Sequence, residues 1–322
     1  MTLRLVTPAN VRSDPTASSS SDSVCAFINN MPDGAFDATE RQFLGLLEEA
    51  STGRTIEVRR YTMAGVPRGA EAARRIAQDY LSLADLYLGA PDLLIVTGSN
   101  PIELNIEDEP YWGDLVTAIT WARERVPRTL LSCLSAHAAL RVFDGIDRAR
   151  LPEKCTGVFT QYVTSESSLT EGLESEVLLP ASRWNTVSSD AVRGAGYEIV
   201  IDADSTGWTV ATRDEDGRGL VLVQGHPEYD PSSLLREYRR DAGRYVRGER
   251  DETPCLPYHC VAPEDWERLE RFHRDVVLDQ RDLALFEAFP FEDVAARAPW
   301  PWRSMATRFF TNWVSSVTQE ED

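Results

Sequence analysis

Two stretches of the chain are apolar without interruption, and a helical pattern separates them. The first is DLLIVTGSN at residues 92–100, and the second is TLLSC at residues 129–133. A strand with one face in water alternates apolar and polar residues, whereas a strand buried on both faces is apolar throughout, as in parallel sheets. Residues 111–126, between the two runs, have the apolar spacing of an amphipathic helix. This order predicts a parallel strand–helix–strand unit.

The same alternation of strand and helix patterns extends along most of the chain. It indicates an α/β fold with a mostly parallel sheet flanked by helices, of the flavodoxin-like type. The further predicted elements are a strand in VCAFINNMPD (24–33) that ends in a Pro-Asp-Gly turn, a helix at 37–51 capped by Asp37 or Thr39, a strand at 55–63, a helix at 70–86 and a hairpin at 207–223 turning at Asp216-Gly217.

Composition suggests where folded structure begins and ends. Residues 1–24 are rich in Ser, Pro and Asp and have no continuous apolar core, so we expect a mobile tail rather than a signal peptide. Residues 317–322 are predicted to be a frayed C-terminus. The 322-residue chain is long enough for a large core, and we expect one α/β domain over residues 25–316.

Charge and cysteine content exclude several classes of protein. The net charge is −19, which argues against a nucleic-acid partner because such partners need a clustered positive surface. No apolar run approaches the roughly 20 residues of a membrane span. The five cysteines form no disulfide framework, so we expect a cytoplasmic protein with reduced thiols. Cys255, His259 and Cys260 lie close together, but no second ligand pair has zinc-site spacing, so no metal site is predicted.

Cys133 lies where the TLLSC strand meets a predicted helix. In an open α/β sheet, ligands bind beyond the carboxyl ends of the strands. A thiol at such a turn is exposed and close to the positive end of the helix dipole, which lowers its pKa from about 8.5. The alternative is a buried cysteine that serves as a small hydrophobic residue.

A histidine and a glutamate follow another apolar strand, in QGHPEYD at residues 224–230. His226 would accept the thiol proton, and Glu228 would orient the imidazole and stabilise its charge. Together with Cys133 they make a nucleophile, a base and an orienting group. The alternative is a solvated surface loop.

Four motifs taken together resemble the homoserine O-acyltransferase family of methionine biosynthesis, which has a class I glutamine-amidotransferase-like fold. The motifs are SCLSAHAAL, LPEKCTGVF, GHPEYD and RFFTNWV, and the likeness covers nearly the whole chain beyond the tail. The resemblance implies that Cys133 takes the acyl group from a CoA thioester, with His226 as general base and Glu228 as its partner. It implies an acyl-CoA co-substrate, no bound cofactor and a possible homodimer.

The resemblance also implies three residues that bind the amino-acid substrate: Lys154 in LPEK, Ser182 in ASRW and Arg240 in REYRRD. Arg240 would grip the substrate carboxylate. Glu103 falls where the family has a glutamate in acetyl-transferring members and a small residue in succinyl-transferring ones. A carboxylate there would repel a succinyl chain, so we expect an acetyl donor.

Several positions depart from the family pattern and leave the acceptor open between homoserine and another hydroxy-amino acid such as serine. These positions are Leu134 and His137 after the nucleophile, the Met31–Gly34 turn and Ala181. Two other functions are compatible with these residues. One is an amidotransferase-like enzyme or thioester hydrolase with the same Cys-His-Glu triad, and the other is a binding module without catalysis.

Overall fold

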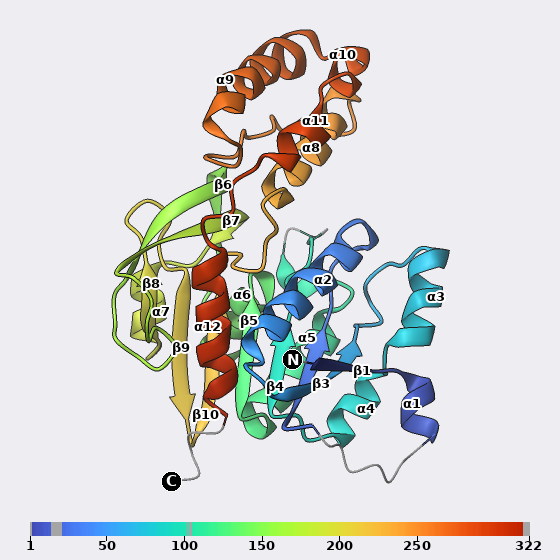
Figure 1. Cartoon of the computed structure of the whole chain (residues 1–322), viewed down its shortest axis with the longest axis vertical. Helices are drawn as coiled ribbons and strands as arrows, with labels where there is room; N and C mark the ends of the chain where they lie inside the picture. The colour runs from blue at the N-terminus through green and yellow to red at the C-terminus, as the bar shows by residue number, and fades with distance from the viewer. Residues whose placement is uncertain (1, 14–20, 102, 104, 318–322) are drawn as a thin grey trace.

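The structure is a computed structural model that describes residues 2–13, 21–101, 103 and 105–317. The strands are β1 (Thr2–Val6), β2 (Ser23–Ile28), β3 (Thr55–Tyr61), β4 (Leu93–Val96), β5 (Arg128–Ser132), β6 (Ala149–Val163), β7 (Glu176–Thr186), β8 (Glu198–Asp202), β9 (Val210–Glu215) and β10 (Arg218–Val223). They form one sheet in the order β1-β3-β2-β4-β5-β10-β9-β8-β6-β7, which crosses the body of the protein in Figure 1.

The half of the sheet from β1 to β10 is parallel. The DLLIVTGSN run forms β4, where Ile95 is paired with Phe27 of β2 and Leu130 of β5. All three side chains are buried. The predicted parallel strands, apolar because both faces are covered, are confirmed.

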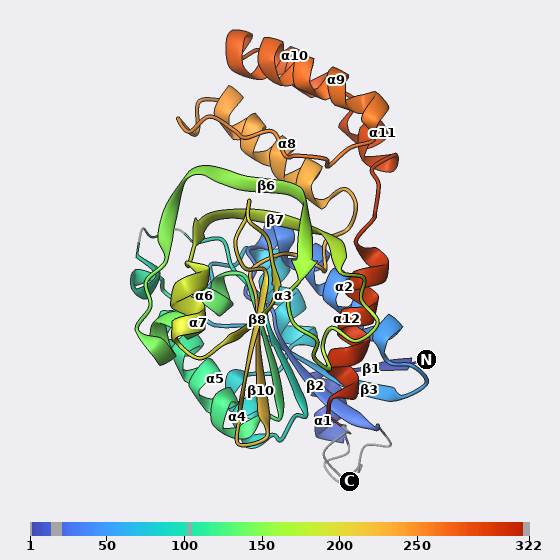
Figure 2. The ribbon, with the colours of Figure 1, turned by 90° about the vertical axis from the view of Figure 1, so that its left-hand side faces the viewer.

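The other half of the sheet is antiparallel. It begins with the predicted hairpin of β9 and β10, whose turn residues Asp216 and Gly217 both have positive φ, as a tight hairpin requires. It ends with β6 and β7, which curve together over the sheet in Figure 2. The curvature brings β6 and β7 over the carboxyl ends of the parallel strands.

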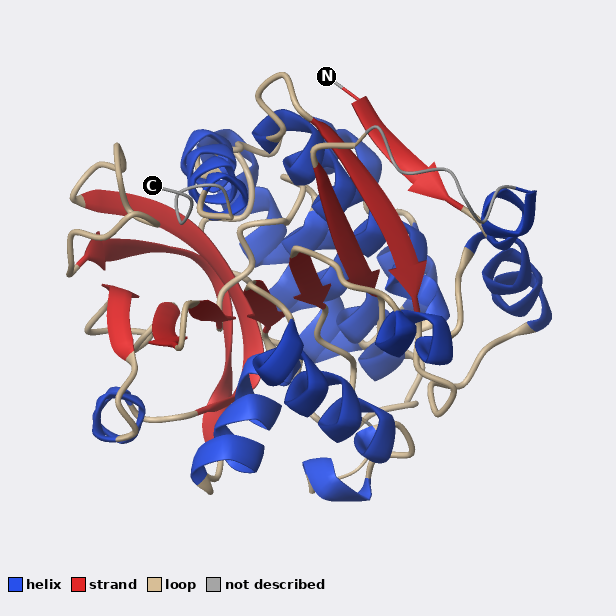
Figure 3. Cartoon of the chain, turned by 90° about the horizontal axis from the view of Figure 1, so that it is seen from below, coloured by secondary structure: helices blue, strands red, loops and turns tan. Residues whose placement is uncertain are grey.

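Helices cover both faces of the sheet, as Figure 3 shows from below. On one face α2 and α12 contribute Phe43 and Trp313 to a core with Phe27. On the other face α5 and α6 contribute Leu115 and Leu140 to a second core. The helices are α1 (Pro8–Ser13), α2 (Asp33–Ala50), α3 (Ala70–Asp79), α4 (Leu83–Leu88), η1 (Ile106–Asp108), α5 (Trp112–Arg125), α6 (Leu134–Asp144), α7 (Ser189–Gly194), α8 (Ser233–Val246), α9 (Pro263–Phe272), η2 (His273–Gln280), α10 (Leu283–Glu287), α11 (Phe291–Ala296) and α12 (Arg303–Ser315).

A helical cap of α8, α9, η2, α10 and α11 stands above the sheet in Figures 1 and 2. Four phenylalanine rings hold it together, with centroids 4.1 to 5.8 Å apart, at positions 272, 286, 289 and 291. The cap joins β6 where the Val158 N–H donates to the Tyr258 carbonyl at 2.8 Å. Gly157 permits this contact, because a Cβ there would lie 2.6 Å from Tyr258 atoms.

The prediction of a tail over residues 1–24 is wrong for its first part. Residues 2–6 form β1, which pairs with β3 at the edge of the sheet, and Val6 is buried. The TLRLV segment alternates apolar and polar residues as a strand does. The Ser-rich composition of the segment that follows it led to the prediction of a tail instead. Residues 14–20 and 318–322, in the expected tail and frayed C-terminus, lie outside the described residues.

The helix predicted from 37 to 51 begins earlier, at Asp33, with Pro32 as its N-cap. Pro-Asp-Gly was interpreted as a turn, but proline's fixed φ suits the entrance of a helix equally well. Asp37 and Thr39 therefore lie inside α2 and do not cap it.

The helix predicted over 70–86 is two helices, α3 and α4. Leu81 leaves the helical path to bridge Tyr61 at the end of β3. Ser82 then starts α4 with a reciprocal capping box to Asp85. Within the described residues, no helix combines the length and apolarity that crossing a membrane needs.

Candidate active site

Cys133 occupies a strained turn between β5 and α6, with φ 51° and ψ −108°. Non-glycine residues rarely adopt positive φ, and such strain is typical of nucleophiles held on a sharp strand-to-helix turn. The Cys133 N–H donates to the Val223 carbonyl of β10 at 2.7 Å. Gly98 makes room beside the turn, because a Cβ there would lie 3.2 Å from the Cys133 Cβ. The thiol is therefore presented, partly exposed, at the carboxyl edge of the sheet.

His226 and Glu228 lie in the loop after β10. The His226 N–H donates to the Pro180 carbonyl of β7 at 2.9 Å. The His226 Nδ1 and the Glu228 Oε1 are 2.8 Å apart, and both side chains are buried. Because the carboxylate engages Nδ1, Nε2 is the ring nitrogen left for Cys133, whose sulfur acts on the imidazole electrostatically.

The protonation of His226 depends on competing effects. Burial alone would lower its pKa, but the Glu228 carboxylate and the Cys133 sulfur outweigh burial and raise the pKa well above the usual 6.5. A histidine held by a carboxylate and close to a cysteine is the arrangement of an activated cysteine nucleophile. His226 Nε2 and Glu228 Oε2 are buried without a hydrogen-bond partner in the described part of the chain.

Tyr229 supports the imidazole from one side, a contact that the sequence analysis missed. The two rings are stacked, with centroids 4.2 Å apart and planes 19° apart. The Tyr229 carbonyl accepts hydrogen bonds from the indole N–H groups of Trp300 and Trp302, at 3.1 and 2.9 Å. Tyr229 therefore fixes the loop after β10 in two ways: its ring packs on the His226 imidazole, and its backbone carbonyl is held by the two indoles.

A cluster of charged and hydroxyl groups joins β6 and β7 to α8. The Lys154 Nζ lies 3.2 Å from the Glu237 Oε2 and 3.1 Å from the Asp241 Oδ2. The hydroxyls of Ser182 and Tyr229 both donate to the Glu237 carboxylate. Burial raises the pKa of Glu237, but Lys154 and these hydroxyls more than reverse it, so Glu237 is a carboxylate anion.

Glu237 and Asp241 were also missed, because they lie in a helix crowded with charges. The available signal was their spacing: residues 237, 240 and 241 share one face of α8. Arg240, which was predicted, donates through Nε to the Asp241 Oδ1 at 2.9 Å, and its side chain is 41% exposed.

Glu103 is an exposed residue of the segment that follows β4. Its backbone N–H donates to the Glu109 Oε1 at 2.8 Å. An exposed carboxylate is screened by water, so its repulsion of a second carboxylate is much weaker than in a closed pocket. This weakens the physical basis for the predicted acetyl donor.

His137 lies one turn beyond Cys133 in α6 and is packed inside the protein. Its Nε2 is 2.9 Å from the Gln224 Oε1, and burial lowers its pKa to about 4. The imidazole is therefore neutral near pH 7 and donates to the amide oxygen. The structure gives it the role of a buried hydrogen-bond donor.

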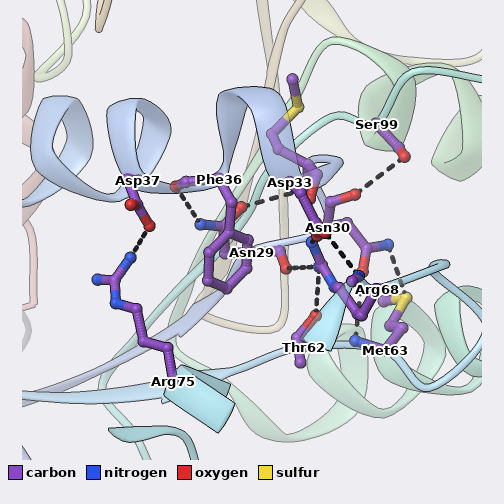
Figure 4. A network of polar contacts seen from close by, with 12 residues as sticks. Asn29, Asn30, Asp33, Phe36, Asp37, Thr62, Met63, Arg68, Arg75 and Ser99 are labelled. Carbon is purple, nitrogen blue, oxygen red and sulfur yellow. Dashed lines mark hydrogen bonds and ion pairs between the residues drawn. The ribbon is translucent and has the colours of Figure 1, made fainter. Parts of the chain in front are cut away.

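The loop from Asn29 to Pro32, between β2 and α2, lines the cavity beside the nucleophile, and Figure 4 shows the polar network that holds it. Arg68 donates to the Met31 carbonyl at 2.6 Å, and the Ser99 hydroxyl donates to the Asn30 carbonyl at 2.9 Å. The second bond ties this loop to the segment that carries Gly98, so the surroundings of Cys133 are held in place before a substrate binds.

These groups line one cavity with a volume of about 1070 Å³. It is lined by every residue that the sequence analysis places in the site: Cys133, His226, Glu228, Lys154, Ser182, Arg240 and Glu103. Among the described side chains, no group of three His, Cys, Asp or Glu residues is arranged to hold a metal ion.

Comparison with known proteins decides the family. The homoserine O-succinyltransferase family profile matches residues 20–322. A homoserine O-succinyltransferase from Rhodopseudomonas palustris is 36% identical over 91% of this chain and 87% of its own length. This chain belongs to the homoserine O-succinyltransferase family. A second member, from Methylorubrum extorquens, is 37% identical over 90% of this chain and 86% of its own length.

A solved structure supports the fold of this family member. A glutamine amidotransferase from Methylobacillus flagellatus matches with a TM-score of 0.50 at 18% identity, covering 94% of this chain and 98% of its own. The predicted amidotransferase-like fold is confirmed, and so are the family and its O-acyltransferase class. The predicted acetyl preference is not supported, since these relatives are named for succinyl transfer.

Proposed function

We propose that this protein transfers a succinyl group from succinyl-CoA to the side-chain hydroxyl of L-homoserine. One observation carries the proposal: the Cys133–His226–Glu228 constellation opens into the same cavity as the Lys154, Glu237 and Arg240 cluster. A nucleophile therefore faces groups suited to a zwitterionic amino acid. The names of the relatives supply the identity of the two substrates.

In the first half-reaction, the Cys133 thiolate attacks the thioester carbonyl of the donor. The bond between that carbon and the CoA sulfur breaks, and CoA leaves as a thiol after taking a proton from His226. The enzyme then carries the acyl group as a thioester on Cys133. Exchange between two thioesters is nearly balanced in free energy, and one difficult step becomes two easier ones.

The oxyanion of the tetrahedral intermediate needs hydrogen-bond donors. The first N–H groups of α6 have no partner inside the helix, and they directly follow Cys133. Leu134 N lies beside Gly98, at 3.4 Å from the position of a Cβ there. We assign the Leu134 N–H to the oxyanion, supported by the positive end of the helix dipole.

In the second half-reaction, His226 Nε2 accepts the proton of the acceptor hydroxyl. The hydroxyl oxygen attacks the acyl carbon, the bond to Cys133 breaks, and the sulfur leaves as the thiolate. Glu228 stabilises the imidazolium that forms, through the 2.8 Å contact at Nδ1. The product ester leaves and the enzyme returns to its starting state.

The acceptor's charged groups match the cluster on α8. Glu237 is anionic and suits the ammonium group of the acceptor. Arg240 donates to Asp241 through Nε, which leaves its two terminal amino groups for the acceptor's carboxylate. Lys154 balances the two cluster carboxylates, and Ser182 orients Glu237. These contacts support an acceptor position on the α8 side of the thioester.

A cytoplasmic site of action and a homodimer are also part of the proposal. The first is supported by the five cysteines, all of them free thiols, and by the use of a CoA donor. Gel filtration with light scattering tests the second, since a dimer has twice the 36.0 kDa mass of the chain.

Two-substrate kinetics test the reaction. With succinyl-CoA and homoserine varied together, we expect O-succinylhomoserine as product and parallel double-reciprocal lines, the mark of a covalent intermediate. Serine and water serve as competing acceptors, and glutamine alone tests amidotransferase activity. If water releases the acyl group from the enzyme faster than any amino acid does, the enzyme is a hydrolase. If glutamine alone yields ammonia, the enzyme is an amidotransferase. Either result would replace the proposal. Cys133→Ala should abolish turnover.

A further inference from the structure

We propose that Arg148 binds the free carboxylate at the far end of the acyl group and thereby selects succinyl over uncharged donors. This inference rests on the acyl transfer proposed above and adds a residue that neither the motifs nor the comparisons assign. Arg148 lies in the turn between α6 and β6 and lines the same cavity as Cys133.

The Arg148 guanidinium lines the cavity that contains the reacting sulfur, and it interacts electrostatically with several groups there. It acts electrostatically on Cys133, and on His137 one helical turn beyond it. It also interacts with Tyr111 and Glu109, the residues that precede α5. These interactions associate the positive charge with α6 and with the segment that precedes α5.

Among the described residues, Arg148 has no close anion, unlike Arg141, Arg150 and Lys154 in the same cavity. Arg141 is paired with Glu107 and Asp147, Arg150 is paired with Glu252, and Lys154 has its two carboxylates. Arg148 makes no hydrogen bond or ion pair within the parts of the chain that the structure describes. Glu109 interacts with it electrostatically but forms no ion pair with it.

A half-buried guanidinium without an ion-pair partner is costly, and burial lowers the pKa of Arg148. Guanidinium groups are not deprotonated in proteins, so the charge persists and an incoming carboxylate would relieve the cost. The planar fork of arginine matches a carboxylate with two parallel hydrogen bonds. Succinyl carries such a carboxylate on the chain attached to the sulfur, whereas acetyl and butyryl groups carry none.

The first half-reaction alone tests this assignment. The rate of Cys133 acylation is measured by quenched intact-protein mass spectrometry, without acceptor, using succinyl-CoA and butyryl-CoA. In Arg148→Gln, the succinyl-to-butyryl ratio of acylation rate constants at low donor concentration should fall about 10- to 100-fold. Arg148→Lys should recover part of the ratio, because it keeps the charge but loses the fork.

Arg141→Gln is the matched control, since this arginine lines the same cavity but is already paired. It should leave the ratio unchanged. Persisting butyryl transfer in Arg148→Gln shows that the variant is folded. If both donors slow equally, Arg148 binds the shared CoA portion, and if neither slows, it binds no donor group; either result overturns the inference. If wild type accepts no acyl-CoA, the proposed function fails first.

Discussion

His226 lies between an anion on one side and a sulfur on the other, and this arrangement sets its protonation. The Glu228 carboxylate raises the His226 pKa against the effect of burial. Because the folded pKa exceeds 6.5, the protonated imidazole stabilises the fold below pH 6.5. That stabilisation is lost as the pH rises through the folded value.

Replacing Glu228 with Gln removes the negative charge but keeps an oxygen near Nδ1. The His226 pKa should fall, and acylation of Cys133 should slow by roughly 100- to 10,000-fold. Histidine-selective NMR titration measures the first effect and single-turnover kinetics the second. Asp230→Asn is the control, because Asp230 is two residues away and paired with Arg41. An unshifted His226 titration in Glu228→Gln would disprove this electrostatic assignment.

The buried His137 should give protein stability a second pH dependence, opposite in sign to that of His226. Its folded pKa is about 4, so between pH 6.5 and 4 only the unfolded chain binds the proton, and acidification reduces stability. At about 1.4 kcal/mol per pH unit, the loss reaches about 3 kcal/mol. His137→Gln can still donate to Gln224 but does not titrate. Urea unfolding at pH 7 and 4.5 should show a smaller loss in this variant than in wild type, and equal losses would refute the argument.

Some site residues were predictable from local sequence and others were not. Cys133 and His226 each follow an apolar strand, and the sheet topology then brings the strand ends together. Glu237 and Arg148 have no such neighbour: each is one charge among many, and only the folded chain shows which charges face the cavity. Stacking of Tyr229 on His226 likewise depends on backbone geometry that sequence does not reveal.

The turn between β5 and α6 depends on a residue from another element, Gly98 after β4. A methyl group at this position would lie 3.2 Å from the Cys133 Cβ, which is tighter than normal packing, and 3.4 Å from the Leu134 N. Adding it should displace the nucleophile and the assigned oxyanion donor from their positions.

Gly98→Ala should therefore lower the acylation rate by at least about 10-fold, since small misplacements of reacting groups are costly. Gly113→Ala, in α5 with open space around it, is the control. It should leave the rate unchanged and raise stability by at most about 0.5 kcal/mol, because Gly113 is in the first turn of α5 and not in the helix interior. Mass spectrometry of the acyl-enzyme gives the rate and urea unfolding the stability. Normal acylation in Gly98→Ala would show that the turn tolerates displacement.

At the level of elements, the apolar strands and the Asp-Gly hairpin were predicted because their signals are local. The division of residues 70–86 at Leu81 was not, since the bridge to β3 that causes it is a tertiary contact. The only local sign of this division in the sequence is Ser82, the serine that caps α4. The edge strand β1 was missed because five residues carry too little periodicity to stand out beside a Ser-rich segment.

Across the whole molecule, the site lies where the helical cap meets the sheet. Lys154 of β6 bridges two carboxylates of α8, with its own side chain 10% exposed. The opposing charges lower the pKa of Glu237 and of Asp241 in spite of burial. These carboxylates therefore stabilise the fold above their unfolded pKa values, and the contribution is lost as the pH falls through the folded values.

Lys154→Met should leave two carboxylates without a counter-charge and cost about 3 kcal/mol in the free energy of unfolding at pH 7. The cost should shrink in acid, where the carboxylates become protonated. Arg239→Met, which breaks an exposed pair on the same helix, should cost less than about 1 kcal/mol. Urea unfolding at pH 7 and pH 4 compares them. A Lys154→Met cost as small as the control's would mean that the cluster does not join the cap to the sheet.

The covalent acyl-enzyme is the claim on which the rest depends, and intact-protein mass spectrometry tests it most directly. Mixed with succinyl-CoA alone, wild type should gain a single succinyl group that peptide mapping places on Cys133. Homoserine should then remove that group and yield O-succinylhomoserine. Cys133→Ala should gain nothing. A wild-type protein that stays unmodified while it makes product, or a label on another residue, would contradict the account.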